Sequence, residues 1–344
     1  MKKLIISTFF VVSAFVGRGQ DFTFSQFYDV PLYRNPAIAG IFNGNLRLTS
    51  AYRSQWSSVT VPYQTQALSA EVSVPVGYSY DLITYGLQLA NDVAGDLKLS
   101  RTQFLPVFCF HKSLYEDVSF LTFGVMGGYI QSQFDPTKAL FGSQFNYTNP
   151  SNPLSGSYDF PRTSFSYWDA STGLAFNSEF NDGTRYYYGV SVYHFLKSKV
   201  FFFDQNSSIL RPRFSLNGGI NFVTGNFDHL YMFGDAMVQG GNRQLVMGMY
   251  YTHNLTDFDD DRDNIALSAG LSYRWADAVI PTARMQMRHL QLGASYDVNI
   301  SKLKSASQYR GGLELTLSYV NTLNALRSRR YEERVGCYDF LKRF

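Results

Sequence analysis

Apolar and polar side chains alternate along most of the chain after about residue 20. Two stretches, from Leu290 and from Asn264, show the pattern most plainly: Leu290, Leu292, Ala294, Tyr296, Val298 and Ile300 alternate with Gln291, Gly293, Ser295, Asp297 and Asn299, and Ile265, Leu267, Ala269, Leu271, Tyr273 and Trp275 alternate with Ala266, Ser268, Gly270, Ser272 and Arg274. Successive side chains of a strand point to opposite faces. Each segment is therefore predicted to be a strand with one apolar and one polar face.

The length of these segments separates two kinds of β-protein. Strands of a soluble sandwich average about five or six residues, whereas a tilted strand needs about ten to cross a membrane, and the segments here run to about ten or more. Many apolar faces end in Tyr, Trp or Phe, as the aromatic girdles of outer-membrane barrels do, and the opposite faces carry Gly, Ser, Asn and Gln, which suit a polar lumen. We predict an all-β fold, a single-chain transmembrane outer-membrane β-barrel, with a soluble β-sandwich as the alternative.

The alternation predicts thirteen antiparallel strands, at 46–56, 64–74, 83–92, 98–112, 118–131, 166–177, 184–195, 212–223, 228–238, 243–252, 264–275, 288–300 and 309–320. Bacterial single-chain barrels have an even number of strands, so about fourteen are expected. Ser198–Asp204 is the candidate for the missing strand.

The connections between the strands differ greatly in length. Tight hairpin turns are predicted at 181–183, 224–226 and 240–242, where Asn, Asp and Gly tolerate positive φ. The segment Ser132–Ser164 instead lacks alternation and contains four prolines. Long loops of such barrels face the exterior and are usually functional. This loop carries aromatic side chains suited to protein contact: Phe134, Phe141, Phe145, Tyr147, Tyr158 and Phe160.

Composition agrees with a barrel and excludes one class of partner. Aromatic residues and charged residues each make up 17% of the chain, and the mean hydropathy is −0.16, a mixture expected when an apolar outer band surrounds a polar lumen. The net charge of +3 comes without the basic patches of nucleic-acid-binding proteins, so no nucleic acid is expected as a partner.

The N-terminus predicts export. Lys2 and Lys3 precede an apolar run from Leu4 to Val16, and Gly17 and Gly19 place small residues before Gln20. This is the pattern of a secretory signal peptide over 1–19, too short to span a bilayer as a helix, which leaves 20–344 as one barrel domain.

No catalytic or metal-binding motif emerges. The five histidines are scattered, and no nucleophile elbow, P-loop or zinc-protease motif is present, so we expect neither an enzyme nor a cofactor. Cys109 is expected to be a packing residue, with pairing to Cys337 as the alternative. The acidic run Asp257–Asp263 is expected to be a solvated turn, with a calcium site as the alternative.

The segment before the first strand, Phe24–Asn45, is rich in aromatic residues and contains Asn35-Pro36-Ala37. Proline removes a ladder donor and argues against a central strand. We expect this segment to cap or plug the lumen.

Three groups of residues in this region carry a resemblance: 24–28 (FSQFY), 35–40 (NPAIAG) and 52–56 (YRSQW). In this order they resemble the opening of the PorP/SprF family of type IX secretion system membrane proteins. The likeness continues at 92–95, 296–303 and 311–314. Leu313 stands where the family leads us to expect a histidine, and Tyr338 where it often has proline.

The resemblance implies an outer-membrane barrel associated with type IX secretion, which in some members serves a secreted adhesin by holding its C-terminal domain at the cell surface. The partners it implies are that adhesin, other type IX components and outer-membrane lipid. The expected partner-binding residues are Asn35, Pro36, Gly40, Arg53, Gln55 and Trp56; alternatively, Trp56 belongs to the aromatic girdle and Arg53 pairs inside the lumen. The competing function is an outer-membrane transporter of small hydrophobic molecules with an N-terminal hatch, which requires an apolar pocket in the lumen.

Overall fold

The computed structural model describes residues 21–26, 28–42, 44–56, 61–77, 79–115, 118–139, 160, 162–180, 182–202, 208–224, 228–255, 265–301, 308 and 310–322. The expected signal peptide, the acidic run at 257–263, Cys337 and most of the long loop lie outside these residues.

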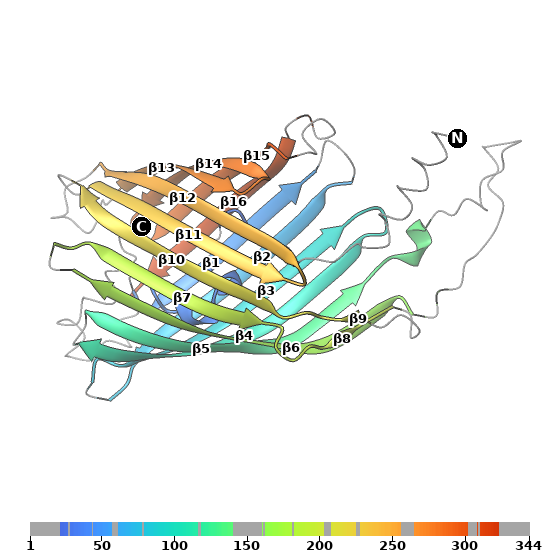
Figure 1. Ribbon diagram of the computed structural model, residues 1–344, viewed down its shortest axis with the longest axis horizontal. Coiled ribbons are helices and arrows are strands. Elements are labelled where there is room, and N and C mark those ends of the chain that lie inside the picture. The colour runs from blue at the N-terminus through green and yellow to red at the C-terminus, as the bar shows by residue number, and fades with distance from the viewer. Residues whose placement is uncertain are drawn as a thin grey trace, which may run out of the picture.

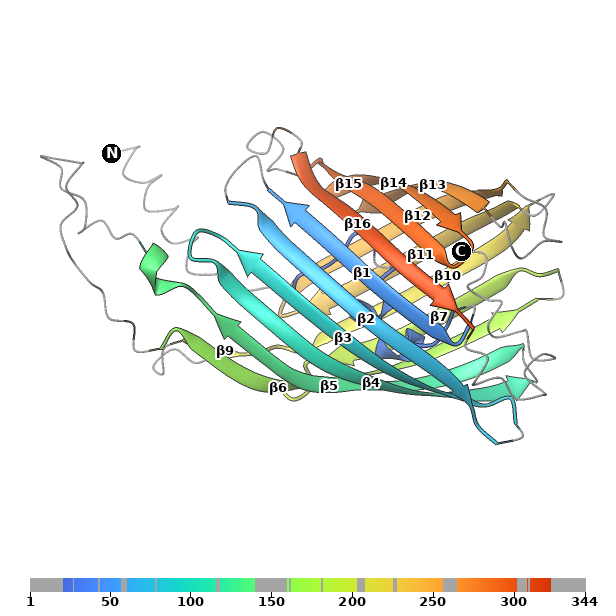
Figure 2. The same cartoon turned by 180° about the vertical axis from the view of Figure 1, so that it is seen from behind.

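Fourteen antiparallel strands form one closed barrel, in the order β1-β16-β15-β14-β13-β12-β11-β10-β7-β6-β5-β4-β3-β2 (Figure 1). The strands are β1 (Leu46–Gln55), β2 (Tyr63–Pro75), β3 (Leu82–Ala94), β4 (Leu99–Tyr115), β5 (Ser119–Gln133), β6 (Ser164–Glu179), β7 (Arg185–Tyr193), β10 (Arg213–Thr224), β11 (Asp228–Gln239), β12 (Asn242–Asn254), β13 (Ile265–Arg274), β14 (Ala278–Met287), β15 (Leu290–Asn299) and β16 (Arg310–Asn321). The first and last strands close it, paired from Leu46↔Asn321 to Gln55↔Gly312 (Figure 2).

All thirteen strands predicted from the alternation are confirmed, and so is the count of fourteen. The proposed fourteenth strand, Ser198–Asp204, is wrong. Its residues instead contribute β8 (Lys199–Val200), which pairs with β9 (Ser208–Ile209) in a separate two-stranded sheet. The missing barrel strand is β14.

The sequence of β14 explains why alternation does not reveal it. Its inward-facing Ala278 and Ile280 are apolar, and Pro281 interrupts the outward face. Proline has no N–H to donate to a ladder. Accordingly, the pairing of β14 with β15 is interrupted between Val279↔Val298 and Thr282↔Ser295, whereas Pro281 stands opposite Leu271 on β13.

The two faces of the barrel wall differ as predicted. On β10, for example, Phe214 and Leu216 point outward and are 57% and 58% exposed, whereas Ser215 and Asn217 point inward and are buried. Leucine, phenylalanine and tyrosine dominate the exposed hydrophobic residues of the other strands. Among the described residues, no helix is long and apolar enough to cross a membrane.

The two ends of the barrel differ in their connections. At the end where β1 stops, residues 134–163 join β5 to β6 and residues 194–212 join β7 to β10; we call this the long-loop end. At the other end, where β1 starts and β16 stops, most connections are shorter, such as the two-residue turn between β14 and β15; we call this the short-turn end. The 3-10 helix η3 (Pro136–Lys138) follows β5 at the long-loop end.

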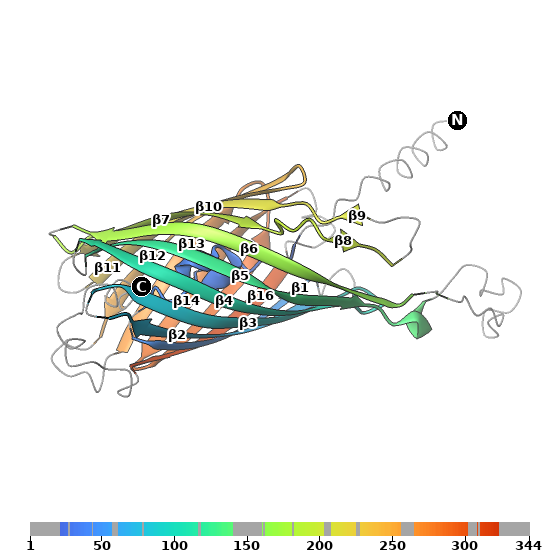
Figure 3. The same ribbon diagram turned by 90° about the horizontal axis from the view of Figure 1, so that it is seen from below.

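The residues before β1 lie against the inside of the barrel wall. They contain two short 3-10 helices, η1 (Pro31–Tyr33) and η2 (Pro36–Ile38), and Figure 3 shows them between the near and far strands. Ala37, Ile38 and Ile41 pack in one hydrophobic cluster with inward-facing residues of the wall such as Tyr187 and Tyr250. We refer to the described residues from Asp21 to Asn45 as the N-terminal segment.

Candidate functional site

The Asn35-Pro36-Ala37 turn of the N-terminal segment lies directly against the barrel wall. Asn35 caps η2: its side-chain oxygen accepts from the N–H of Ala37 at 2.9 Å. Its side-chain nitrogen donates to the carbonyl oxygens of Leu174 at 3.1 Å and Val190 at 3.3 Å, on β6 and β7. Asn35 is fully buried, so one side chain joins the turn to two strands.

Three inward-facing glycines make this approach possible. A Cβ atom on Gly173 would lie 1.9 Å from Asn35 Oδ1, one on Gly189 would lie 2.6 Å from Asn35 Nδ2, and one on Gly124 would lie 2.5 Å from the nitrogen of Ala37. These glycines stand on the neighbouring strands β5, β6 and β7. No other residue type leaves room for the turn there.

Gly40 holds the part of the N-terminal segment that lies near the short-turn end. Its φ of +78° suits glycine, and an added Cβ would lie 2.0 Å from Thr84 Oγ1. Its N–H donates to Glu71 Oε2 at 2.9 Å. Glu71 also accepts from both Nε and Nη2 of Arg47, so the carboxylate is paired with a cation while it holds the backbone.

A carboxylate on β16, that of Glu314, holds the part of the N-terminal segment that lies nearer the long-loop end. Glu314 accepts from the backbone N–H groups of Ser25 and Gln26, each at 2.7 Å. Arg53 bridges Glu314 at 3.0 Å and Asp297 at 2.9 Å. Arg274 donates to the same oxygen of Asp297 at 2.9 Å. Arg53 thus pairs inside the lumen, as the alternative interpretation of the sequence held.

Two further ion pairs join the middle of the segment to the wall. Arg34 contacts Asp235 at 2.7 Å, and Asp29 contacts Arg284 at 2.7 Å, with every side chain in these pairs at most 6% exposed. Breaking such a buried pair costs about 3–5 kcal/mol because one charge is left uncompensated. Both ends of each pair are therefore needed to keep the segment in place.

The first described residue, Asp21, lies among three cationic groups at the long-loop end. It pairs with Arg101 at 2.7 Å and Arg213 at 3.2 Å and accepts from His194. Burial raises the pKa of Asp21, but Arg101, His194 and Arg213 outweigh it and hold that pKa well below its usual range. Burial lowers the pKa of His194, but Asp21 and Asp169 outweigh it, so the pKa of His194 is raised.

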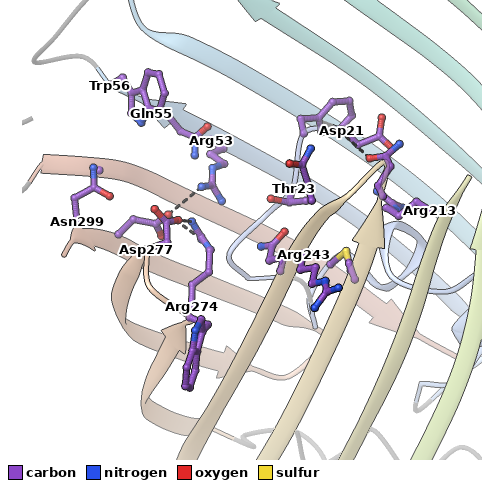
Figure 4. Close-up of a pocket in the computed structure, with 18 residues that line it drawn as sticks. Asp21, Thr23, Arg53, Gln55, Trp56, Arg213, Arg243, Arg274, Asp277 and Asn299 are labelled. Carbon is purple, nitrogen blue, oxygen red and sulfur yellow. Dashed lines mark hydrogen bonds and ion pairs between the residues drawn. The ribbon is translucent and has the colours of Figure 1, made fainter. Parts of the chain in front are cut away.

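A cavity of about 430 Å³ opens at the long-loop end; we call it the mouth cavity (Figure 4). Arg53 and Arg274 lie on one side of it, and Asp21 and Arg213 lie on the other. Most of its lining is charged or carries an amide: Asp21, Phe22, Thr23, Arg53, Gln55, Trp56, Arg213, Met237, Gln239, Asn242, Arg243, Gln244, Arg274, Trp275, Asp277, Asp297, Asn299 and Gly311. This lining differs from the apolar pocket that a transporter of hydrophobic molecules requires.

The structure divides the six residues singled out from the sequence into two groups. Arg53, Gln55 and Trp56 line the mouth cavity. The other three, Asn35, Pro36 and Gly40, are buried in the N-terminal segment. Trp56 is 37% exposed and stacks on Tyr63.

Sequence reasoning missed the β11–β12 side of the cavity. Gln239, Asn242 and Gln244 flank the Gly240-Gly241 turn, in which both glycines have positive φ as predicted. Their place beside a predicted hairpin turn was the available signal, since residues that flank a turn lie at a barrel rim.

Cys109 is a buried free thiol whose Sγ lies 2.9 Å from the carbonyl oxygen of Pro36, so it packs beneath the turn as expected. Within the described ranges, no group of three or more His, Cys, Asp and Glu side chains could hold a metal ion.

Comparison with known proteins identifies one family. The sequence model of the family described as type IX secretion system membrane protein PorP/SprF matches residues 16–319. No protein with a curated description matches the chain.

Several solved structures are similar to this chain at low sequence identity. One is CdiB from Acinetobacter baumannii, which is 6% identical with a TM-score of 0.41. The match covers 80% of this chain and 60% of CdiB. The chain is 12% identical to a deletion mutant of the monoaromatic hydrocarbon channel TodX, with a TM-score of 0.44 and coverage of 88% and 95%. It is 8% identical to BamA from Haemophilus ducreyi lacking POTRA domains 1–3, with a TM-score of 0.38 and coverage of 80% and 70%. The chain thus spans less than two thirds of CdiB.

Proposed function

Because this chain belongs to the PorP/SprF family of type IX secretion system membrane proteins, we propose that it binds a secreted surface protein at the long-loop end of its barrel. Its role is to hold the C-terminal domain of that protein, an adhesin, at the cell surface without catalysing a reaction. Other type IX secretion components and outer-membrane lipid are its remaining partners. A signal peptide over 1–19 directs its export.

The mouth cavity is the observation that carries this proposal. It is concave, it lies where the long loops of outer-membrane barrels meet the exterior, and it falls within the size of common ligand sites. The amide groups of Gln55, Gln239 and Gln244 can both donate and accept hydrogen bonds, as a peptide backbone does. The aromatic ring of Trp56 adds an anchor of the kind that dominates protein interfaces.

The N-terminal segment has a second role in this proposal: it plugs the lumen. Ion pairs at Asp21, Asp29 and Arg34 and the backbone contacts of Glu314 and Glu71 support this role. A plugged barrel retains a partner at its mouth and does not pass it through. Asn35, Pro36 and Gly40 then act on the partner indirectly, by keeping the floor of the site in place.

Gentle detergent extraction of the tagged protein from its own cells tests the proposal. Mass spectrometry of the eluate is expected to find a secreted protein retained through its C-terminal domain. A Gln244→Trp variant fills the mouth cavity and is expected to retain at least about tenfold less. The matched control is Met249→Trp, on the same strand but facing outward and half exposed.

Two results would oppose the proposal. One is equal retention by Gln244→Trp and Met249→Trp, which would place the partner elsewhere. The other is recovery of the folded barrel with lipid or fatty acid in its lumen and no secreted protein, which would favour the transporter.

A further inference from the structure

The start of the N-terminal segment lies at the long-loop end. Three residues of the wall bind Asp21. Arg101 stands near the start of β4, Arg213 stands at the start of β10, and His194 follows directly after β7. The N–H of Asp21 also donates to Gln239, the last residue of β11, at 3.4 Å. All four positions belong to the same rim of the barrel.

The end of the segment lies at the short-turn end. The N–H of Asn45 donates to the carbonyl oxygen of Asn321, the last residue of β16, at 3.1 Å, and the carbonyl oxygen of Asn45 accepts from Ser73 at 2.9 Å. Between the two rims the segment contacts the middle of the wall, where Cys109 and Gly124 lie against Pro36. The segment therefore crosses the whole barrel between Asp21 and Asn45.

We infer that the N-terminal segment threads the lumen from the outside inward, so that Asp21, Phe22 and Thr23 face the exterior although β1 begins on the periplasmic side. Long loops mark the exterior end of outer-membrane barrels, and both chain ends of the barrel wall lie at the short-turn end. β1 starts at the short-turn end, yet the contacts of Asp21 place the start of the N-terminal segment at the opposite end.

This threading makes the start of the N-terminal segment part of an interaction surface. Asp21, Phe22 and Thr23 form part of the wall of the mouth cavity. A protein bound in that cavity would touch both the barrel rim and these residues. This contact rests on the proposed function, whereas the threading itself does not.

Cysteine labelling in intact cells tests the threading. A single cysteine is introduced by Thr23→Cys, with Cys337→Ser as the background because Cys109 is buried. Asp96→Cys, in the exposed turn of the long-loop end between β3 and β4, and Ser79→Cys, in the exposed turn of the short-turn end between β2 and β3, are the matched controls. The probe is a membrane-impermeant maleimide, applied before and after permeabilising the outer membrane.

Thr23→Cys is expected to react from outside together with Asp96→Cys, while Ser79→Cys reacts only after permeabilisation. Labelling of Thr23→Cys only together with Ser79→Cys would overturn the threading, and so would a failure of Thr23→Cys to react in the purified barrel, from which any bound partner has been removed. Labelling of Ser79→Cys alone from outside would overturn the placement of the long-loop end on the exterior of the cell. The pattern requires no partner, so it succeeds or fails separately from the proposed binding of a secreted protein.

Discussion

Replacing Gly173 by alanine should release the Asn35 turn from the barrel wall. The new Cβ would stand 1.9 Å from Asn35 Oδ1, far inside the contact distance of a carbon and an oxygen, so Asn35 has to move. Its three hydrogen bonds, at 2.9, 3.1 and 3.3 Å, are each worth about 0.5–1.5 kcal/mol, and overpacking adds about 1–3 kcal/mol. If the free energy that favours the packed turn over the displaced turn falls by about 3 kcal/mol, the population of molecules with a displaced turn rises about a hundredfold.

Trypsin provides the assay, because Arg34 directly precedes the turn and is 2% exposed in the folded state. The purified Gly173→Ala protein should be cut after Arg34 about a hundred times faster than the wild type, since cleavage follows the population of the open form. The control is Gly234→Ala on β11, whose added Cβ meets only Met247 at 3.9 Å. Cleavage of Gly173→Ala no faster than this control, with the barrel still folded, would refute the close-packed turn.

Three other predictions concern the charges that hold the segment. Arg34→Met leaves Asp235 unpaired in the lumen and should lower the free energy of unfolding, measured by thermal unfolding, by about 3–5 kcal/mol. The double variant Arg34→Met/Asp235→Leu should recover most of that loss, and wild-type stability of the single variant would contradict the ion pair. Glu314→Gln removes a charged acceptor from two backbone N–H groups and should speed cleavage after Arg34 about tenfold; an unchanged rate would oppose this. The pKa of His194 is raised, so its contribution to the stability of the folded state is fully present below about pH 6.5 and is lost as pH rises through the raised pKa. The lowered pKa of Asp21 keeps that carboxylate charged throughout. Cleavage after Arg34, relative to an exposed turn, should therefore accelerate at alkaline pH in the wild type but not in His194→Gln, and equal pH profiles would contradict the assignment.

Alternation revealed the barrel because the wall has one lipid-facing and one lumen-facing side along most strands. It failed at β14 for a local reason: the inward-facing Ala278 and Ile280 are apolar and buried, and Pro281, which lacks an N–H to donate to the ladder, stands on the outward face. The apolar run at 200–203 was predicted to be a barrel strand for the opposite reason. In the structure Val200 belongs to the short strand β8, and Phe202 packs against Phe134 and Phe165 outside the barrel sheet.

The site was predictable in part. The unusual Asn35-Pro36 pair and the aromatic content marked the N-terminal segment as something other than a strand or a solvated leader. Its receiving surface could not be read from the sequence, because Gly124, Gly173 and Gly189 lie on three strands and come together only once the register of those strands is known. The ion partners of the segment are likewise 80 or more positions away in the chain, as Asp21 and Arg101 and, farther apart, Arg34 and Asp235 illustrate.

The most direct test of partner binding at the mouth is site-specific photo-crosslinking in the native cells. A benzophenone amino acid replaces Gln244 in the mouth cavity in one strain and Ser79 at the short-turn end in another. The account predicts an adduct from position 244 whose peptides map to the C-terminal domain of a secreted protein, and no such adduct from position 79. An adduct from position 79 alone, or none from position 244 in a folded barrel, would contradict it.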